Sequence, residues 1–123
     1  MSDRCMIGLV NSDNTITSVY CHWNGDPKDA GAILLNNYKS VCEVRRLLQR
    51  GYLRALGNSP EESAQMENPG EAADTDENQQ TFKSRADSFG VSFLYLFSND
   101  GWMFATSVGS GWRKLSEVLE KWQ

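Results

Sequence analysis

His22 is the only histidine in this 123-residue sequence, so proton transfer or metal ligation by an imidazole would have to use it. Its neighbour Cys21 would point to the opposite face of a strand, which removes the nearest cysteine–histidine pair. Cys5 and Cys42 could approach the imidazole in a fold, but no spacing in the sequence indicates such a nucleophile. We therefore expect His22 to be a structural or ligand-contacting residue, and we expect the protein not to be an enzyme.

The three cysteines form an odd set without the paired spacing of a zinc knuckle, which predicts reduced and mostly buried thiols. Metal ligation by oxygen would need carboxylates on ordered elements, and seven of the 16 carboxylates lie in one polar segment. The sequence has no glycine-rich phosphate-binding motif. It thus predicts neither a metal site nor a cofactor.

Residues 20–31, with the sequence YCHWNGDPKDAG, combine groups that could bind a compact anion. The segment contains two aromatic rings, an imidazole and a lysine close to the expected start of a helix. Free N–H groups at a helix start favour phosphate, and aromatic rings can stack on bases. In a simple hairpin register, Arg4 would lie across from Cys21 or His22 and add a guanidinium. The alternative is that Trp23 belongs to the core and the rest is an ordinary turn.

The formal net charge of −4 is unevenly distributed. Residues 58–80 contain seven carboxylates and no Lys or Arg, whereas the rest of the chain carries 12 basic and nine acidic groups. The mildly basic body is compatible with a compact anionic ligand, while the negative total and the lack of a basic stripe argue against a nucleic acid polymer. The alternative is that these scattered surface charges have no functional meaning.

The acidic segment, residues 58–80, is predicted to be a mobile loop. It contains one Met, two prolines, no aromatic residue and no β-branched aliphatic residue, so it cannot bury enough apolar area to offset the entropy of ordering. We interpret it as a flexible insertion within a single domain of residues 1–123, because the 43 residues after it are too few for a typical independent core.

Two β-hairpins are predicted from β-rich runs separated by turn residues. The first joins residues 4–10 to residues 15–23, and the second joins residues 91–97 to residues 102–108 through the turn NDG. In the first hairpin, alternation puts three residues on one face and two on the other: Val19, Cys21 and Trp23 against Tyr20 and His22.

Strand 91–97 is apolar on both faces, with Leu94 and Leu96 on one and four residues on the other: Val91, Phe93, Tyr95 and Phe97. In so small a protein, such a strand must be central in its sheet or covered by another subunit.

The spacing of apolar residues predicts three helices, over residues 28–38, 41–48 and 115–122. Pro27 and Asp29 are suited to open the first helix, and Ser40 and Gly51 to begin and end the second. The elements together predict an α+β fold, in which an antiparallel sheet from two hairpins packs with two to three helices.

The sequence offers no sign of export or membrane insertion. It lacks a run of eighteen apolar residues, and its first ten residues do not have the basic and apolar regions of a signal peptide. We therefore expect a cytoplasmic protein without a membrane partner.

Four stretches of the chain resemble a family of small phage proteins, the anti-Thoeris sponges. These are DRCMIGLVN, SVYCHWNGDP, LLNNY and the closing WRKLSEVL, so the resemblance covers about the first 57 and the last 35 residues. The family motif reads YCHWDGYP, and this sequence departs from it at Asn24 and Asp26. The acidic segment 58–80 has no counterpart in the resemblance.

The resemblance implies a protein that forms dimers or higher assemblies and sequesters cyclic ADP-ribose-type signals, with cyclic oligonucleotides as a further ligand of some members. It implies a non-catalytic pocket at a subunit interface that stacks adenine and clamps phosphates. The chemistry of the side chains suggests Trp23, Phe82 or Phe89, and the plane of Arg113, for stacking. Arg4, Lys28, Arg85 or Arg113 would serve the phosphates, with His22 as a further contact.

Two other functions stay open. The acidic segment could mimic nucleic acid or occupy a basic groove, which would make the protein an inhibitor that acts by protein contact. A hydrolase of the same cyclic signal is the third and least favoured possibility, since no set of catalytic groups is evident.

Overall fold

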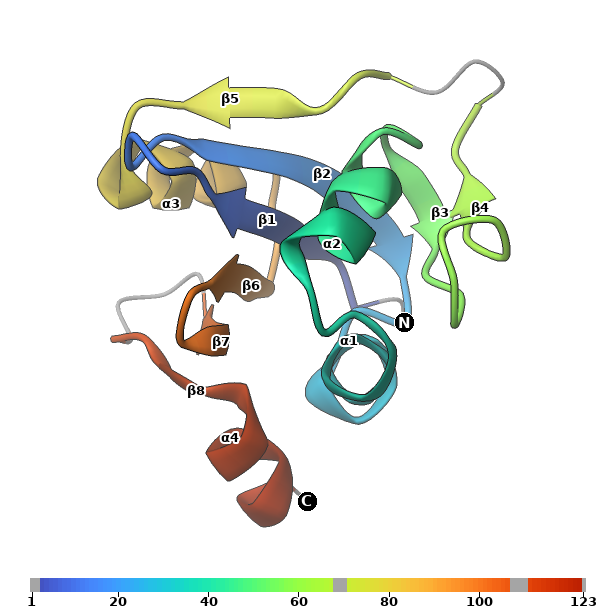
Figure 1. Ribbon diagram of the computed structural model, residues 1–123, viewed down its shortest axis with the longest axis vertical. Helices are drawn as coiled ribbons and strands as arrows, with labels where there is room; N and C mark the ends of the chain where they lie inside the picture. Colours follow the sequence, from blue (N-terminus) through green and yellow to red (C-terminus); the bar gives the residue numbers. More distant parts are fainter. Residues whose placement is uncertain (1–2, 68–70, 107–110, 123) are drawn as a thin grey trace.

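The computed structural model describes residues 3–67, 71–106 and 111–122, and it confirms the α+β class (Figure 1). The strands within these residues are β1 (Cys5–Val10), β2 (Ile16–Trp23), β3 (Leu53–Ala55), β4 (Ala64–Gln65), β5 (Asp74–Asp76), β6 (Phe93–Ser98), β7 (Gly101–Thr106) and β8 (Arg113–Lys114). The helices are η1, a π-helix (Pro27–Gly31), α1 (Ala32–Asn37), α2 (Val41–Leu48), α3 (Gln79–Ser88) and α4 (Leu115–Lys121).

All these strands join one sheet in the order β4–β3–β2–β1–β6–β7–β8, and β5 pairs with β2 as well. Both predicted hairpins are confirmed: β1 pairs with β2 so that Cys5 lies opposite Cys21, and β6 pairs with β7. Residues 107 and 108 of the second expected hairpin lie outside the described residues. The sheet is largely antiparallel, but β1 and β6 are parallel, as are β2 and β3.

Strand β6 is central because β1 and β7 flank it, which explains why both of its faces are apolar. Tyr95 and Phe97 lie in the core cluster on one face, and Leu94 and Leu96 lie in the cluster on the other. The expectation for Val91 is wrong. It packs with Leu94 and Leu96, because the strand begins only at Phe93 and its alternation does not extend back to residue 91.

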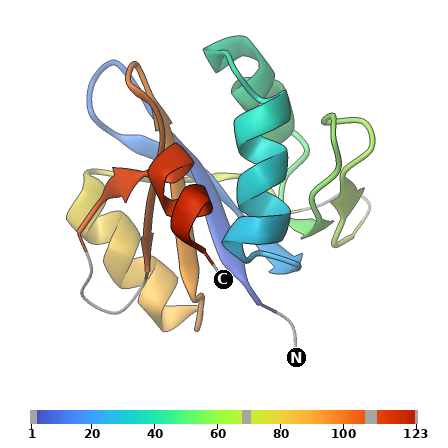
Figure 2. The same ribbon diagram turned by 90° about the horizontal axis from the view of Figure 1, so that it is seen from below.

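The helices cover the two faces unequally. Helices α1, α2 and α4 contribute to the first cluster and α3 to the second, and Figure 2 shows α1 and α2 on one side of the strands with α3 on the other. Two hydrogen bonds from buried rings to backbone carbonyls fix these layers: Tyr95 donates to Gly25 at 2.8 Å, and Trp102 donates to Tyr38 at 2.8 Å.

The predicted helix 28–38 forms as η1 followed by α1. Pro27 takes the first helical position and Asp29 lies in the first turn, as expected, and Asp26 is the N-cap, because its carboxylate accepts the backbone N–H of Asp29 at 2.9 Å. Asn24 adopts a positive φ of 58°, which Asn tolerates better than most residues. A Cβ on Gly25 would lie 2.8 Å from the carbonyl oxygen of residue 3. Both departures from the family motif therefore have local structural roles.

The other two predicted helices are confirmed as α2 and α4. Ser40 caps α2 by accepting the backbone N–H of Glu43 at 3.2 Å, and Gly51 has the positive φ of 81° expected just beyond a helix end. Each helix turns its apolar residues into the first core cluster, α2 through Val44, Leu47 and Leu48 and α4 through Leu115 and Val118.

The acidic segment 58–80 is more structured than expected of a loop. Its described residues include β4, which pairs with β3, β5, which pairs with β2, and the first two residues of α3. These short strands form because their backbone groups pair with the open edges of β2 and β3. Such pairing requires little burial of apolar area. The mobility of this segment stays a prediction.

Candidate functional site

A path of rings crosses the surface from the end of β2 to the end of α3. Trp23 lies 6.0 Å from His22 between ring centroids, and His22 lies 5.8 Å from Tyr20. Tyr20 in turn lies 5.8 Å from Tyr52 and 5.7 Å from Phe89. Trp23 is 42% exposed and Phe89 is 38% exposed, so both ends of the path present large apolar surface to solvent.

The far end of this path forms a cavity of about 290 Å³, here called the aromatic pocket. Its lining residues are Tyr20, Tyr52, Met66, Glu67, Glu71 and Phe89. Tyr52 and Phe89 meet edge to face, with an interplanar angle of 74° and 6.2 Å between centroids. The three rings therefore make a continuous aromatic wall.

Hydrogen bonds orient two of these rings. The Tyr20 hydroxyl lies 2.7 Å from Nδ1 of His22, and burial raises the pKa of Tyr20. The Tyr52 hydroxyl donates to Asp74 at 2.5 Å. Burial, followed by this hydrogen bond, raises the pKa of Tyr52 to about 12. Both phenols are therefore neutral near neutral pH.

Two arginines border the ring path. The guanidinium of Arg54 lies 5.6 Å from the centroid of Trp23 and donates to the carbonyl of Met66 at 3.0 Å, so it stands between the tryptophan and the aromatic pocket. Arg4 is exposed, and continuing the β1–β2 register by one residue sets it opposite His22, as the sequence suggested. Both cations are placed to meet an anion beside the rings.

The structure brings together His22, Trp23 and Phe89 from the predicted set, but it removes Phe82. That ring has no exposed surface and stacks on Trp112 within the second core cluster. On α3, Phe82 faces the sheet, while Phe89 stands at the C-cap and faces outward. Phe82 is therefore a core residue and is not available to stack on a ligand.

Arg85 is also unsuited to clamp a phosphate, because protein groups already occupy its guanidinium. It bonds to Asp76 at 2.9 Å, to Asp74 at 3.1 Å and to the Ser18 hydroxyl at 2.7 Å. Burial opposes its charge, but Asp76 and Asp74 outweigh burial and raise its pKa. Its charge is thus neutralised within the fold, although the guanidinium still lies 5.8 Å from the Phe89 centroid.

The expected phosphate site at the start of the first helix is not supported. Asp26 already accepts one of the free N–H groups, and burial together with the negative charges of Asp26 and Asp3 raises the pKa of Asp29. Lys28 is exposed there and lies between Asp26 and Asp29 in the sequence. An additional anion would meet negative charge at this place.

Arg113 lies on β8 and lines a separate cavity with α4 residues, which shares no lining residue with the aromatic pocket. It is therefore not part of the ring path. Sequence reasoning counted Tyr20 among the rings of residues 20–31 without naming it as a ligand contact, and it missed Tyr52 and Arg54. The aromatic pair Tyr20 and His22 on one strand face was visible in the sequence, whereas Tyr52 and Arg54 sit on or beside a three-residue strand without a local signal.

The cysteines lie apart from His22. Cys5 and Cys21 face each other across β1 and β2 in the first core cluster, and burial raises the pKa of Cys5 well above its usual range. Cys42 is exposed on α2. Among the described residues, no group of three or more His, Cys, Asp or Glu could hold a metal ion.

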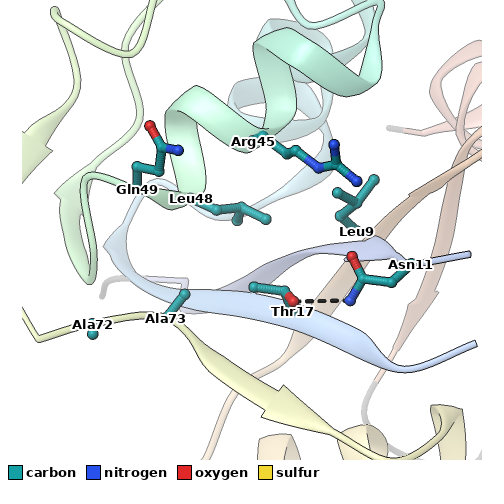
Figure 3. A pocket seen from close by; sticks show the side chains of 8 residues that line it. All are labelled: Leu9, Asn11, Thr17, Arg45, Leu48, Gln49, Ala72 and Ala73. Carbon is teal, nitrogen blue, oxygen red and sulfur yellow. Dashed lines mark hydrogen bonds between the residues drawn. The ribbon is translucent and has the colours of Figure 1, made fainter. Parts of the chain in front are cut away.

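A second cavity of about 280 Å³, the Arg45 groove, lies between α2 and the first hairpin (Figure 3). Leu9, Leu48 and Ala73 give it apolar walls, and Arg45 reaches along its upper side. Asn11 donates to the Thr17 hydroxyl at 2.9 Å, which fixes the orientation of its amide at the rim. Sequence reasoning did not identify this groove.

The fold and the aromatic pocket define an α+β chain with a surface cavity walled by rings. In comparisons with known proteins, no protein-family model, curated protein or solved structure matches this chain. Of the helices described here, none is both long and apolar enough to cross a membrane.

Proposed function

We propose that this chain is a non-catalytic binding protein that sequesters a compact nucleotide-like signal of the cyclic ADP-ribose type without cleaving it. The observation that supports the proposal is the path of rings from Trp23 to Phe89, which ends in the aromatic pocket. Stacking on aromatic side chains contributes about 1–3 kcal/mol per base in single-stranded nucleic acid sites. Such contacts suit a flat base and need no reacting group.

The cations beside the rings fit the rest of such a ligand. Arg54 stands between Trp23 and the aromatic pocket, and Arg4 is exposed nearby, so phosphates could be held outside the pocket while the base lies within it. A pocket of about 290 Å³ is at the small end for ligand sites. A second copy of the chain would complete the enclosure, which is the role that we propose for a dimer or higher assembly.

The resemblance to the anti-Thoeris sponges supplies the biological setting of the proposal. In it, a phage protein acts in the cytoplasm of the bacterial host and removes an immune signal by binding it. A cyclic oligonucleotide is the alternative ligand, with the same requirement for stacking and charge-assisted hydrogen bonds.

The proposal is tested by incubating the protein with cyclic ADP-ribose isomers, removing free ligand by gel filtration, and heating the protein to release what it holds. Mass spectrometry of the supernatant should return intact ligand. A cleaved product would contradict a non-catalytic role, and the absence of any retained ligand would contradict binding.

The variant Phe89→Ala tests whether the ligand binds in the aromatic pocket. This ring is exposed at the end of α3, so its loss should spare the core and weaken ligand binding by about 1–3 kcal/mol, as expected for one stacked base. Val41→Ala is the matched control, because Val41 is similarly exposed (36%) but lies on α2, outside the pocket. Equal affinities of the two variants would place the ligand elsewhere.

The alternative of an inhibitor that acts through its acidic segment has less support. Three of the seven carboxylates in that segment pair within the chain: Glu61 with Arg46, and Asp74 and Asp76 with Arg85. Less of the negative charge is therefore available to imitate nucleic acid or to fill a basic groove.

A further inference from the structure

The aromatic pocket carries negative charge as well as rings. Glu67 and Glu71 line it, and Asp74 bonds to the Tyr52 hydroxyl just behind its wall. Asp74 is paired with Arg85, but among the described residues no ion pair engages Glu67 or Glu71. Two carboxylates without a basic partner thus face the same cavity as three aromatic rings.

This arrangement favours a cation. The face of each aromatic ring is electron-rich and attracts positive charge, and a carboxylate attracts it more strongly. An anion in the same cavity would be repelled by both. Two guanidinium groups lie beside the pocket. That of Arg85 is already paired with Asp74 and Asp76, and that of Arg54 lies over Trp23 and bonds to the carbonyl of Met66 at the edge of the pocket.

We infer that the aromatic pocket binds a flat, positively charged nitrogen heterocycle, of which an N1-alkylated adenine is the type. Its ring would stack on the wall formed by Tyr20, Tyr52 and Phe89, and its N–H groups would donate to Glu67 or Glu71. The inference rests on the proposed function, since it assigns the base of the ligand to this pocket, and among cyclic ADP-ribose isomers it selects those closed through N1 of the adenine, whose base carries the positive charge. The phosphates lie outside, toward Arg54.

The test compares two small probes, 1-methyladenosine and adenosine, by isothermal titration calorimetry near neutral pH. The first carries a positive charge on its base and the second does not, while their stacking surfaces are nearly the same. We expect 1-methyladenosine to bind more tightly by about tenfold, and the difference to vanish in alkaline buffer that removes its charge. Equal binding of the two probes near neutral pH would overturn the inference.

Variants show whether the preference comes from this pocket. Glu67→Gln and Glu71→Gln, alone and combined, should lower the ratio between the two probes, because each substitution removes a negative charge that favours the charged base over the neutral one. Glu120→Gln on α4 is the matched control, because it removes an exposed carboxylate outside the pocket. Phe89→Ala should weaken both probes. An unchanged ratio in the double variant, or unchanged binding of 1-methyladenosine to Phe89→Ala, would overturn the inference.

The two proposals can fail separately. If cyclic ADP-ribose is retained intact but the probes bind equally, the chain is a nucleotide binder and the charge preference is wrong. If 1-methyladenosine binds selectively at the aromatic pocket but cyclic ADP-ribose is not retained, the proposed sequestration fails and the cation preference of the pocket is supported.

Discussion

At the scale of single residues, Tyr52 joins the pocket to the charged network beneath it. Its ring forms part of the aromatic wall, and its hydroxyl donates to Asp74, which also bonds to Arg85. Ionising the phenol would put a second anion against Asp74. The same contact therefore links the shape of the pocket to the protonation of one side chain.

This contact predicts a loss of stability in alkali. Because the pKa of Tyr52 is raised to about 12, the neutral phenol stabilises the fold fully below its ordinary pKa, and this contribution is lost as the pH rises toward 12. Urea unfolding of the wild type should show the free energy of unfolding falling over that range. In Tyr52→Phe the fall should be smaller, and near neutral pH the variant should be less stable by about 0.5–1.5 kcal/mol.

Burial also raises the pKa of other tyrosines, such as Tyr95, in both proteins, and the loss of this contribution in alkali accounts for the remaining fall. An identical alkaline dependence in wild type and Tyr52→Phe would show that the hydrogen bond to Asp74 does not hold the phenol neutral.

The sequence identified part of the candidate site at this scale. Trp23 and His22 were visible as polar-tipped rings on a predicted strand, and the structure places both on the ring path. Phe82 and Phe89 could not be told apart, since each is a single aromatic residue among polar neighbours. Their difference depends on where α3 ends, and no strong apolar pattern marks that helix.

At the scale of elements, α2 shows a local sequence signal that determines structure. Ser40 and Glu43 make reciprocal contacts that resemble a capping box. The Ser40 hydroxyl accepts the N–H of Glu43, while the Glu43 carboxylate accepts the N–H of Lys39, the residue before the N-cap, at 3.1 Å. The helix that they begin contributes Val44, Leu47 and Leu48 to the core. Its stability is therefore coupled to that of the whole fold.

Ser40→Ala should destabilise the protein by about 1 kcal/mol, because it leaves a helix N–H without its side-chain partner. The shift can be measured as a lower midpoint of urea unfolding. Ser116→Ala is the control, since Ser116 is exposed on α4 and is not its N-cap residue, which is Lys114. A Ser40→Ala protein as stable as the control would mean that the cap contributes nothing measurable.

The elements that sequence reasoning missed lack such signals. Helix α3 buries only Phe82 and Ala86, so its sequence has no apolar stripe. Strands β3, β4 and β5 are two or three residues long, too short for an alternation to be read, and they form because the edge of β2 or of a neighbour offers backbone partners. Their formation is a property of the sheet rather than of the local sequence.

At the scale of the whole molecule, Arg85 connects parts that are distant in the chain. From α3 it reaches Ser18 on β2 and two carboxylates on β5, and these contacts fasten the acidic segment to the sheet. Asp76 is only 6% exposed, and its carboxylate pairs with Arg85 at 2.9 Å. Loss of the arginine would leave a buried carboxylate unpaired.

Arg85→Met should therefore lower the free energy of unfolding by about 2–4 kcal/mol, less than a fully buried pair would cost because Asp74 remains 40% exposed. Adding Asp76→Asn should recover part of this loss, since the buried charge is then gone. Arg46→Met, which removes an exposed pair with Glu61, should cost less than about 1 kcal/mol. Equal losses in the two single variants would contradict this account.

The sequence predicted both hairpins and the central position of β6 as one of two options, but not how the hairpins join. The parallel pairing of β1 with β6 brings together residues that are far apart in the sequence, such as Cys5 and Phe93. No local sequence pattern indicates such a partner. This pairing is favoured because it places β6 inside the sheet, where both of its apolar faces are buried. The expected assembly into dimers or larger oligomers stays a prediction.

That parallel pair also sets the order in which the chain can fold. During synthesis, β1 and β2 leave the ribosome long before β6, so one edge of the nascent hairpin stays open until the last quarter of the chain has emerged. Contacts between such distant segments close slowly because the intervening chain must first be gathered. We expect the dense negative charge of the acidic segment, which is made in that interval, to repel other copies of the chain from this open strand edge.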